Sequence, residues 1–171
     1  MTSYDLTDGR EPVSHAEIDY LKSLAWGLRE NPVVVQIGAA TGVFTVALLE
    51  ERPGATLFSI DIEPCPEEFE NVRKAGLDAT RVIRLLGRSE EIGCHFPYQC
   101  DLLFVDGDHF GAAKDFRAWR DKVRPGGVVA FHDYMEACPP NNPGCVYADV
   151  KECLTGIPPL GRAERVIAFG L

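Results

Sequence analysis

Two apolar segments of the sequence end in clusters of ionisable side chains. They are DLLFVDGDHF (101–110), which ends on Asp106, Asp108 and His109, and GGVVAFHDY (126–134), which ends on His132 and Asp133. If both segments are paired parallel strands, their ends lie roughly 5 Å apart. Asp106 and Asp133 could then share one hard cation or one substrate hydroxyl, so we expect the chemistry at this place.

A glycine-containing loop follows an earlier apolar run. VVVQI (33–37) is typical of a strand covered on both faces, and GAATG (38–42) leads from it into a predicted helix at 43–51. Backbone N–H groups and a helix N-terminus would face an anion here. Ala40 stands where the dinucleotide fingerprint has its second glycine, which restricts the approach of a pyrophosphate. A tight turn without a ligand is the alternative.

Asp61 ends the next predicted strand, about 20 residues after the glycine loop. At this separation a carboxylate reaches the hydroxyls of a ribose. A solvated cap before Pro64 is the alternative, but it does not explain the register. The loop and Asp61 together favour a nucleoside site.

Strands and helices alternate along the chain. We expect strands at 33–37, 55–61, 80–86, 101–106, 128–132 and 164–171, and helices at 43–51, 66–76, 111–123 and 146–154, after an opening helix with a Ser14/Glu17 capping box. This order predicts an α/β fold, a doubly wound Rossmann-like and mostly parallel sheet with helices on both faces. After residue 155 there is room for one good strand or a cramped hairpin, so we expect a sheet truncated at its last strand.

Length and composition limit the number of domains and the classes of partner. The 171 residues favour one domain, 1–171, and 26 acidic against 17 basic residues give a formal charge of −9, which disfavours nucleic acid. No segment approaches the ~20 apolar residues of a membrane span. MTSYDLTDGREP lacks the order of a signal peptide, so we expect a cytoplasmic protein.

The six cysteines include no C-x-x-C pair, which argues against a structural zinc site. Reduced thiols are expected. Cys138 and Cys145 flank a Pro/Asn loop and could form a bridge in an oxidising setting.

Four segments in this order, VVVQIGAATGVFT, FSID, FVDGDH and RPGGVVAFHDY, resemble class I S-adenosylmethionine-dependent methyltransferases. They cover residues 33–134. In that family the glycine loop holds the methionine part of the cofactor, the acid after the second strand holds the ribose, and the segment after the third strand packs near the adenine. The resemblance implies that the cofactor contacts are Gly38, Ala39, Gly42, Asp61, Gly87, Arg88, Ser89 and Asp106. Gln36 stands where an acid is common.

Within the family, the chain is most similar to the metal-dependent O-methyltransferases that act on catechols, caffeoyl-CoA and macrolide sugars. These hold Mg²⁺ or a similar ion with an acid after the fourth strand and an acid pair after the fifth. The resemblance implies Asp106, His132 and Asp133 as metal ligands. Imidazole is softer than Mg²⁺ prefers, so another metal binds, or His132 is not a ligand, or there is no metal.

The expected reaction is O-methylation of a small hydroxyl-bearing molecule, with Asp106 and His109 as catalytic residues. A cation on Asp106 and Asp133 would lower the pKa of the hydroxyl and align it with the sulfonium methyl. His109 lies where these relatives place a general base, and an unperturbed histidine pKa of about 6.5 suits that role. The alternative is that His109 or Asp108 caps the following helix.

The sequence indicates the residues of the acceptor pocket less clearly than those of the cofactor site. Tyr134, Cys138 and the loop at 139–145 are candidates for the pocket or a lid, or they form a plain connection. The chain ends without the insertions from which many relatives build an acceptor site, so we expect a pocket completed across a homodimer, or a fold that keeps the cofactor crevice and has lost catalysis.

Two other functions stay open. One is a non-catalytic module that binds S-adenosylmethionine or S-adenosylhomocysteine. The other is an NAD-dependent oxidoreductase, which Ala40 and the acid-rich strand ends disfavour. The sequence does not identify the methyl acceptor.

Overall fold

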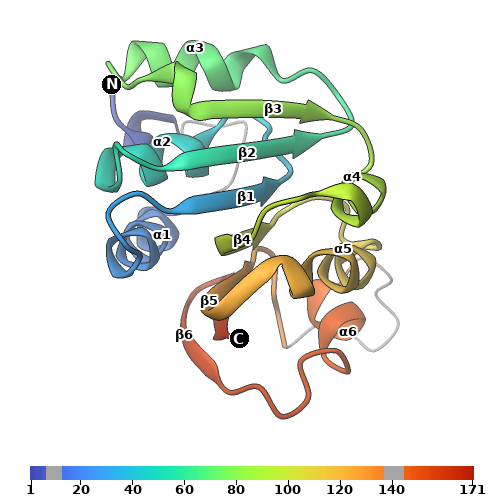
Figure 1. Ribbon diagram of the computed structural model, residues 1–171. Coiled ribbons are helices and arrows are strands. Elements are labelled where there is room, and N and C mark those ends of the chain that lie inside the picture. The colour runs from blue at the N-terminus through green and yellow to red at the C-terminus, as the bar shows by residue number, and fades with distance from the viewer. Residues whose placement is uncertain (7–12, 137–144) are drawn as a thin grey trace.

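The structure is a computed structural model that describes residues 1–6, 13–136 and 145–171. Its centre is one seven-stranded sheet with the strand order β3-β2-β1-β4-β5-β7-β6 (Figure 1). The strands are β1 Val33–Ile37, β2 Thr56–Asp61, β3 Val82–Leu86, β4 Cys100–Val105, β5 Val123–Phe131, β6 Pro159–Ala163 and β7 Val166–Gly170. β1 to β5 pair in parallel, and β7 pairs antiparallel with both β5 and β6. The predicted doubly wound α/β fold is confirmed.

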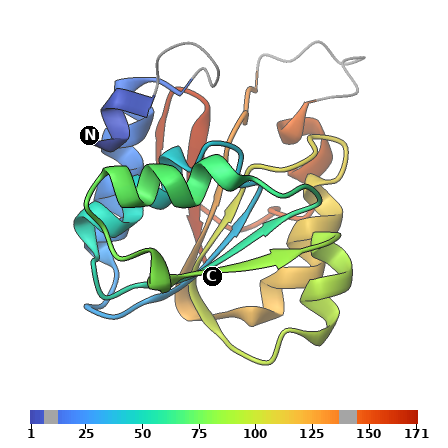
Figure 2. The same ribbon diagram turned by 90° about the horizontal axis from the view of Figure 1, so that it is seen from above.

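Helices cover both faces of the sheet. They are α1 His15–Gly27, α2 Val43–Glu51, α3 Pro66–Lys74, α4 Ser89–His95, α5 Ala112–Trp119 and α6 Val146–Val150, with short 3₁₀ turns η1 Ser3–Leu6, η2 Ala79–Arg81 and η3 Arg120–Lys122. Figure 2 shows α1, α2 and α3 on one side of the strands and α4, α5 and α6 on the other. Each layer buries its own apolar cluster against the sheet. Within the described ranges, no helix is long and apolar enough to cross a membrane.

The C-terminal hairpin corrects the expectation of a truncated sheet. β6 pairs with β7, and β7 pairs with β5, so that Ile167 lies opposite Phe131. The sequence PLGRA hid β6, because it contains proline and glycine and, as an exposed edge strand, has no buried apolar pattern. The hairpin alternative is therefore correct, and its turn carries Arg165 to the end of β5.

The two tryptophans differ from each other in burial. Trp119 is fully buried, as its helical spacing predicts. The sequence pattern also predicts a core face for Trp26 on the opening helix, but this prediction is wrong, because Trp26 is 69% exposed. The guanidinium of Arg52 lies over its ring, 4.9 Å from the centroid, so the indole packs at the surface by a cation–π contact.

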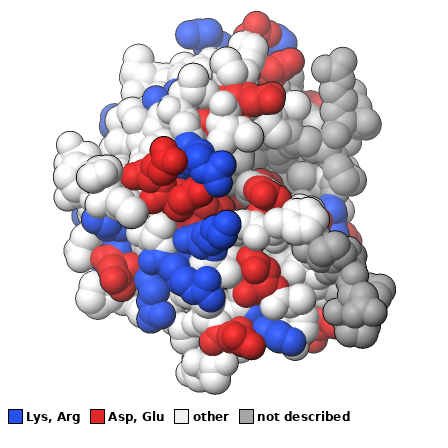
Figure 3. Space-filling view, turned by 90° about the vertical axis from the view of Figure 1, so that its right-hand side faces the viewer, with Lys and Arg blue, Asp and Glu red and all other residues white. Residues whose placement is uncertain are grey.

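The strand register gathers the polar residues at one edge. Ile37 pairs with Ile60 on one side and with Val105 on the other, and Val105 pairs with Phe131. The residues that follow these strands therefore lie along the carboxyl edge, where ligands bind in such sheets. Figure 3 looks onto this edge, where basic and acidic side chains are interspersed.

Candidate functional site

Two cavities meet at the carboxyl edge. The larger has a volume of about 500 Å³ and lies at the ends of β1 and β2 and beside the loops that follow β3 and β4. The smaller has a volume of about 190 Å³ and lies between α1, α2 and the ends of β4 and β5. Gly38, Ala40 and Asp106 line both cavities. Asp106 thus stands at the junction.

The glycine loop brings β1 close to the end of β4. Gly38 has φ +85°, and a Cβ there would lie 2.1 Å from the carbonyl oxygen of Asp106, so only glycine fits. Gln36 fixes the loop, because its Nε2 donates to the Gly38 carbonyl over 2.7 Å. Gly42 lines neither cavity; it lets α3 pack closely, since a Cβ there would lie 3.0 Å from the Cα of Glu68.

Glu68, which the sequence analysis missed, supports the loop from α3. Its fully buried carboxylate accepts hydrogen bonds from Thr45 at 2.5 Å and Ser59 at 2.9 Å and pairs with Arg84. The same Thr45 hydroxyl lies 2.9 Å from Gln36 Oε1. The sequence did contain one sign that Glu68 is buried. It lies four residues before the buried Val72, so the two share one face of the helix.

Asp61 lines the larger cavity and holds the loop at the same time. Its Oδ2 accepts the Ala39 N–H over 2.9 Å, and its Oδ1 accepts the Glu63 N–H over 3.0 Å. Burial would raise the pKa of Asp61, but these backbone donors hold it below its ordinary value. The Cys65 thiol and the Ala40 N–H also hydrogen-bond to Asp61 and lower its pKa further, while the residue still borders the larger cavity.

Gly87, Arg88 and Ser89 line the far end of the larger cavity. The hydroxyl of Ser89 donates to Asp115 on α5, and Trp119 Nε1 donates to the Ser89 carbonyl over 3.0 Å. Burial raises the pKa of Asp115 to about 6. No sequence pattern indicated Asp115, which comes from the helix after β4.

Asp115→Asn should change how stability depends on pH. The folded state binds the Asp115 proton more tightly than the unfolded chain, so stability is lost as pH rises from about 4 through about 6, up to about 3 kcal/mol. The neutral variant avoids this loss. Urea denaturation at pH 5 and pH 8 should show the variant gaining stability relative to wild type at pH 8. Asp121→Asn, at an exposed site, is the control, and identical pH profiles for wild type and Asp115→Asn would contradict the burial argument.

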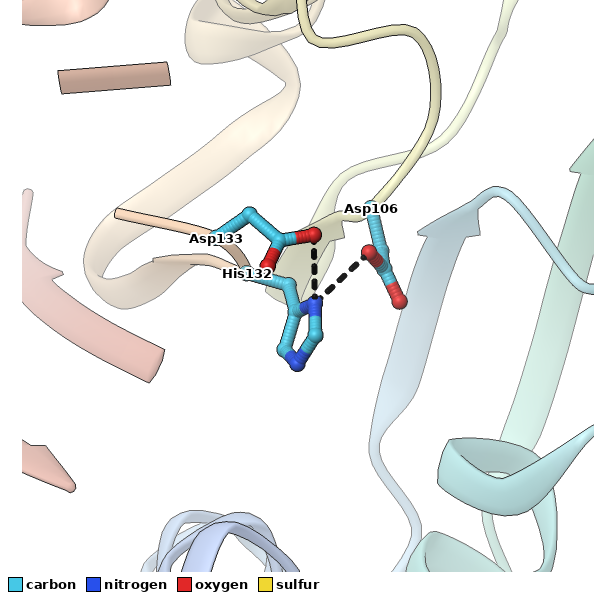
Figure 4. A group of neighbouring side chains, drawn as sticks. All are labelled: Asp106, His132 and Asp133. Carbon is cyan, nitrogen blue, oxygen red and sulfur yellow. Dashed lines mark hydrogen bonds and ion pairs between the residues drawn. The ribbon is translucent and has the colours of Figure 1, made fainter. Parts of the chain in front are cut away.

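Asp106, His132 and Asp133 come together as the sequence predicted. His132 Nδ1 lies 3.1 Å from Asp106 Oδ1 and 3.2 Å from Asp133 Oδ2, so both carboxylates face one imidazole nitrogen (Figure 4). Ligand atoms of the three residues all lie within 4.8 Å of one another. The imidazole is almost wholly buried.

Three further side chains complete this acid cluster. Glu17 on α1 is fully buried, with Oε1 3.6 Å from His132 Nε2. Arg165 Nη1 donates to Asp133 Oδ1 over 2.7 Å, and His109 Nε2 lies 3.0 Å from Asp133 Oδ2. We define the acid cluster as Glu17, Asp106, His109, His132, Asp133 and Arg165.

The cluster supplies its own positive charge. Burial alone would lower the pKa of His132, but the adjacent carboxylates of Asp106 and Asp133, together with the carboxylate of Glu17 3.6 Å away, raise it to about 11. The His132 contact lowers the pKa of Asp133 to about 2. Burial opposes ionisation of Glu17, yet His132 and the Ser14 N–H lower its pKa to about 2. Imidazolium and guanidinium therefore balance much of the carboxylate charge near neutrality.

A divalent cation does not fit the cluster in this arrangement. Asp133 Oδ1 is taken by Arg165, and His132 Nδ1 lies between two carboxylates that hold it in its protonated form. A metal ligand has to be deprotonated, and an imidazole among carboxylates is not the oxygen set that Mg²⁺ prefers. The three predicted ligands lie together, and metal binding itself stays a prediction.

His109 does not cap the helix that follows it. α5 begins after Gly111 without a side-chain cap, and Asp149 on α6 accepts the Ala113 N–H over 2.6 Å. Asp108 accepts the Phe110 N–H over 3.1 Å within the turn. His109 lines neither cavity and lies at the rim against Asp133.

The expected acceptor segment is only partly described. Tyr134 is buried and packs against Tyr147 and Phe169, so its ring belongs to the core. Residues 137–144, with Cys138, lie outside the described residues, as does the proposed bridge from Cys138 to Cys145.

Residues 35–134 match the family described as methyltransferase domain. The chain belongs to this family. That stretch contains the glycine loop, Asp61, Asp106 and His132-Asp133, and the match confirms the resemblance to class I S-adenosylmethionine-dependent methyltransferases. No curated protein matches this methyltransferase by sequence.

Solved structures share the fold. The O-methyltransferase TomG from Streptomyces achromogenes, involved in tomaymycin synthesis and solved with S-adenosylmethionine, is 22% identical over 98% of this chain and 84% of TomG, with a TM-score of 0.74. An O-methyltransferase from Bacillus cereus in complex with S-adenosylhomocysteine is 16% identical, over 99% and 87% of the two chains, with a TM-score of 0.75. Precorrin 8W decarboxylase from Methanobacterium thermoautotrophicum is 21% identical, over 94% and 91%, with a TM-score of 0.70. The fold therefore does not fix the substrate.

Proposed function

We propose that this methyltransferase transfers the methyl group of S-adenosylmethionine to a hydroxyl group of a small molecule. The observation that carries the proposal is the pair of connected cavities, where the glycine loop and Asp61 lie on one side of Asp106 and the acid cluster lies on the other. The names of TomG and of the Bacillus cereus enzyme support the same cofactor and an oxygen acceptor.

The charge of the larger cavity supports a sulfonium cofactor over a dinucleotide. Its lining includes five acidic and two basic side chains: Asp61, Glu90, Asp106, Asp108 and Asp115 against Arg88 and Lys114. Such a surface attracts a cation and repels a pyrophosphate. The larger cavity would hold the nucleoside, and the smaller one, next to the glycine loop, would hold the methionine part. The methyl group would then lie near Asp106.

His109 is the candidate base of the reaction. With its Nε2–H donating to Asp133, the Nδ1 lone pair is left to accept a proton; this tautomer is inferred from the contact. As the acceptor oxygen bonds to the methyl carbon, the carbon–sulfur electron pair returns to sulfur, and the hydroxyl proton passes to His109. A carboxylate that orients a histidine and stabilises its protonated form is a known arrangement for general bases.

Ligand-induced stabilisation tests the cofactor. S-adenosylhomocysteine at 100 times its dissociation constant should stabilise the chain by about 2.7 kcal/mol, seen as a raised melting temperature, and NAD should not. Stabilisation by NAD alone would favour the oxidoreductase. Binding without S-adenosylhomocysteine release from S-adenosylmethionine, over a panel of phenols, catechols and sugars, would favour the non-catalytic module.

A metal-assisted reaction is the second candidate. The spacing of Asp106, His132 and Asp133 favours it, but Arg165 would have to leave Asp133. The homodimer was expected because the chain lacks the insertions from which many relatives build an acceptor site. It stays a prediction, and sedimentation velocity would measure the oligomeric state. We propose residues 1–171 as one cytoplasmic domain.

A further inference from the structure

Arg165 occupies the oxygen of Asp133 that a metal ion would need. Its Nη1 lies 2.7 Å from Asp133 Oδ1. The other side of the guanidinium faces Glu17, with Nε 3.2 Å from Oε1 and Nη2 3.2 Å from Oε2. A guanidinium stays charged and matches a carboxylate with two parallel contacts. One arginine thus joins two carboxylates of the acid cluster.

Segments far apart in the sequence build this contact. Glu17 is anchored on α1, where its Oε2 accepts the Ser14 N–H over 2.8 Å, and its Oε1 accepts the Arg165 backbone N–H over 3.1 Å. Glu164, directly before Arg165, has φ +48°, and Asp133 has φ +53°. Left-handed backbone is uncommon outside glycine and concentrates at functional sites. Left-handed backbone thus occurs at Asp133 and directly before Arg165, at the two ends of the contact.

We propose that Arg165 is the resident cation of the acid cluster and takes the place that the sequence assigned to a divalent ion. This proposal rests on the proposed function. It adds that the methyl transfer does not depend on a bound metal. Arg165 is then a positioning residue. It holds Asp133, and Asp133 holds His109, so the C-terminal hairpin contributes to the site.

Mn²⁺ binding to the full chain tests this proposal without an acceptor. The electron paramagnetic resonance signal of free Mn²⁺ should persist in the presence of wild type and fall with Arg165→Gln, which frees Asp133 Oδ1 and removes a positive charge. We expect the variant to bind Mn²⁺ at least about tenfold more tightly. Arg165→Lys keeps the charge and should behave as wild type. Adding Asp133→Asn to Arg165→Gln should abolish the gained binding, which places the ion.

Arg162→Ala is the matched control on the same hairpin. Arg162 donates to the carbonyls of Glu164 and Tyr134 over 2.8 and 3.1 Å and touches no side chain of the acid cluster. This variant should not gain Mn²⁺ binding. Equal binding by wild type and Arg165→Gln, or no binding by either, would overturn the proposal.

Two measurements keep the outcomes separate. If Arg165→Gln does not fold, wild type decides, since tight Mn²⁺ binding by wild type overturns the proposal and its absence supports it. Calorimetry with S-adenosylhomocysteine on the same wild-type sample tests the proposed function. Failure to bind that ligand would reject the function, and the Mn²⁺ comparison would still decide whether Arg165 replaces a metal ion.

Discussion

His109→Ala should lower turnover by about 10²–10⁴-fold, the usual contribution of a general base, with little change in affinity for S-adenosylhomocysteine. The imidazole lies at the rim of the site, against Asp133, and lines neither cofactor cavity. Removing it should therefore affect the transfer of the proton and spare the binding of the cofactor. Release of S-adenosylhomocysteine with a panel of phenolic and catechol acceptors gives the rate, and calorimetry gives the affinity.

Two variants separate basicity from positioning. His109→Gln keeps a side chain that can donate to Asp133 but has no basic nitrogen, so it should be nearly as slow as His109→Ala. His95→Ala removes a histidine at the end of α4, away from the acid cluster, and should keep the wild-type rate. A His109→Gln enzyme with near wild-type turnover would show that His109 acts by position alone and that another group takes the proton.

The strand-end residues could be predicted because the information is local. Asp61, Asp106 and His132 each come at the end of an apolar run, and the register of parallel strands brings those ends together. The same reasoning placed the glycine loop beside them. The same reasoning could not predict which side chains the carboxylates contact.

Glu17 and Arg165 show why the rest could not be predicted. They are 148 residues apart and meet only because β7 returns antiparallel beside β5. The capping box explained Glu17 locally, although its place on the same helical face as Leu21 and Ala25 was a sign of burial. Nothing in the sequence indicated that Arg165 lies at the site, because β6 was not recognised as a strand. The sequence therefore shows the acids at the strand ends without the arginine that lies beside them.

Asp61→Ala should weaken S-adenosylhomocysteine binding by about 10²–10⁴-fold. Two charge-assisted hydrogen bonds to the ribose hydroxyls at about 1.5–3 kcal/mol each give this range. The lowered pKa keeps the carboxylate ionised at neutral pH, so both oxygens accept. Isothermal titration calorimetry with wild type and variant makes the measurement.

The variant also loses two backbone contacts, so the control has to separate binding from loop stability. Asp61→Asn can still accept the Ala39 N–H through its amide oxygen but carries no charge, and it should lose less affinity than Asp61→Ala. Asp78→Ala removes an exposed acid that caps η2 and should bind as wild type. If Asp61→Ala melts like wild type and binds S-adenosylhomocysteine with unchanged affinity, Asp61 only holds the glycine loop, and the ribose site lies elsewhere in the crevice.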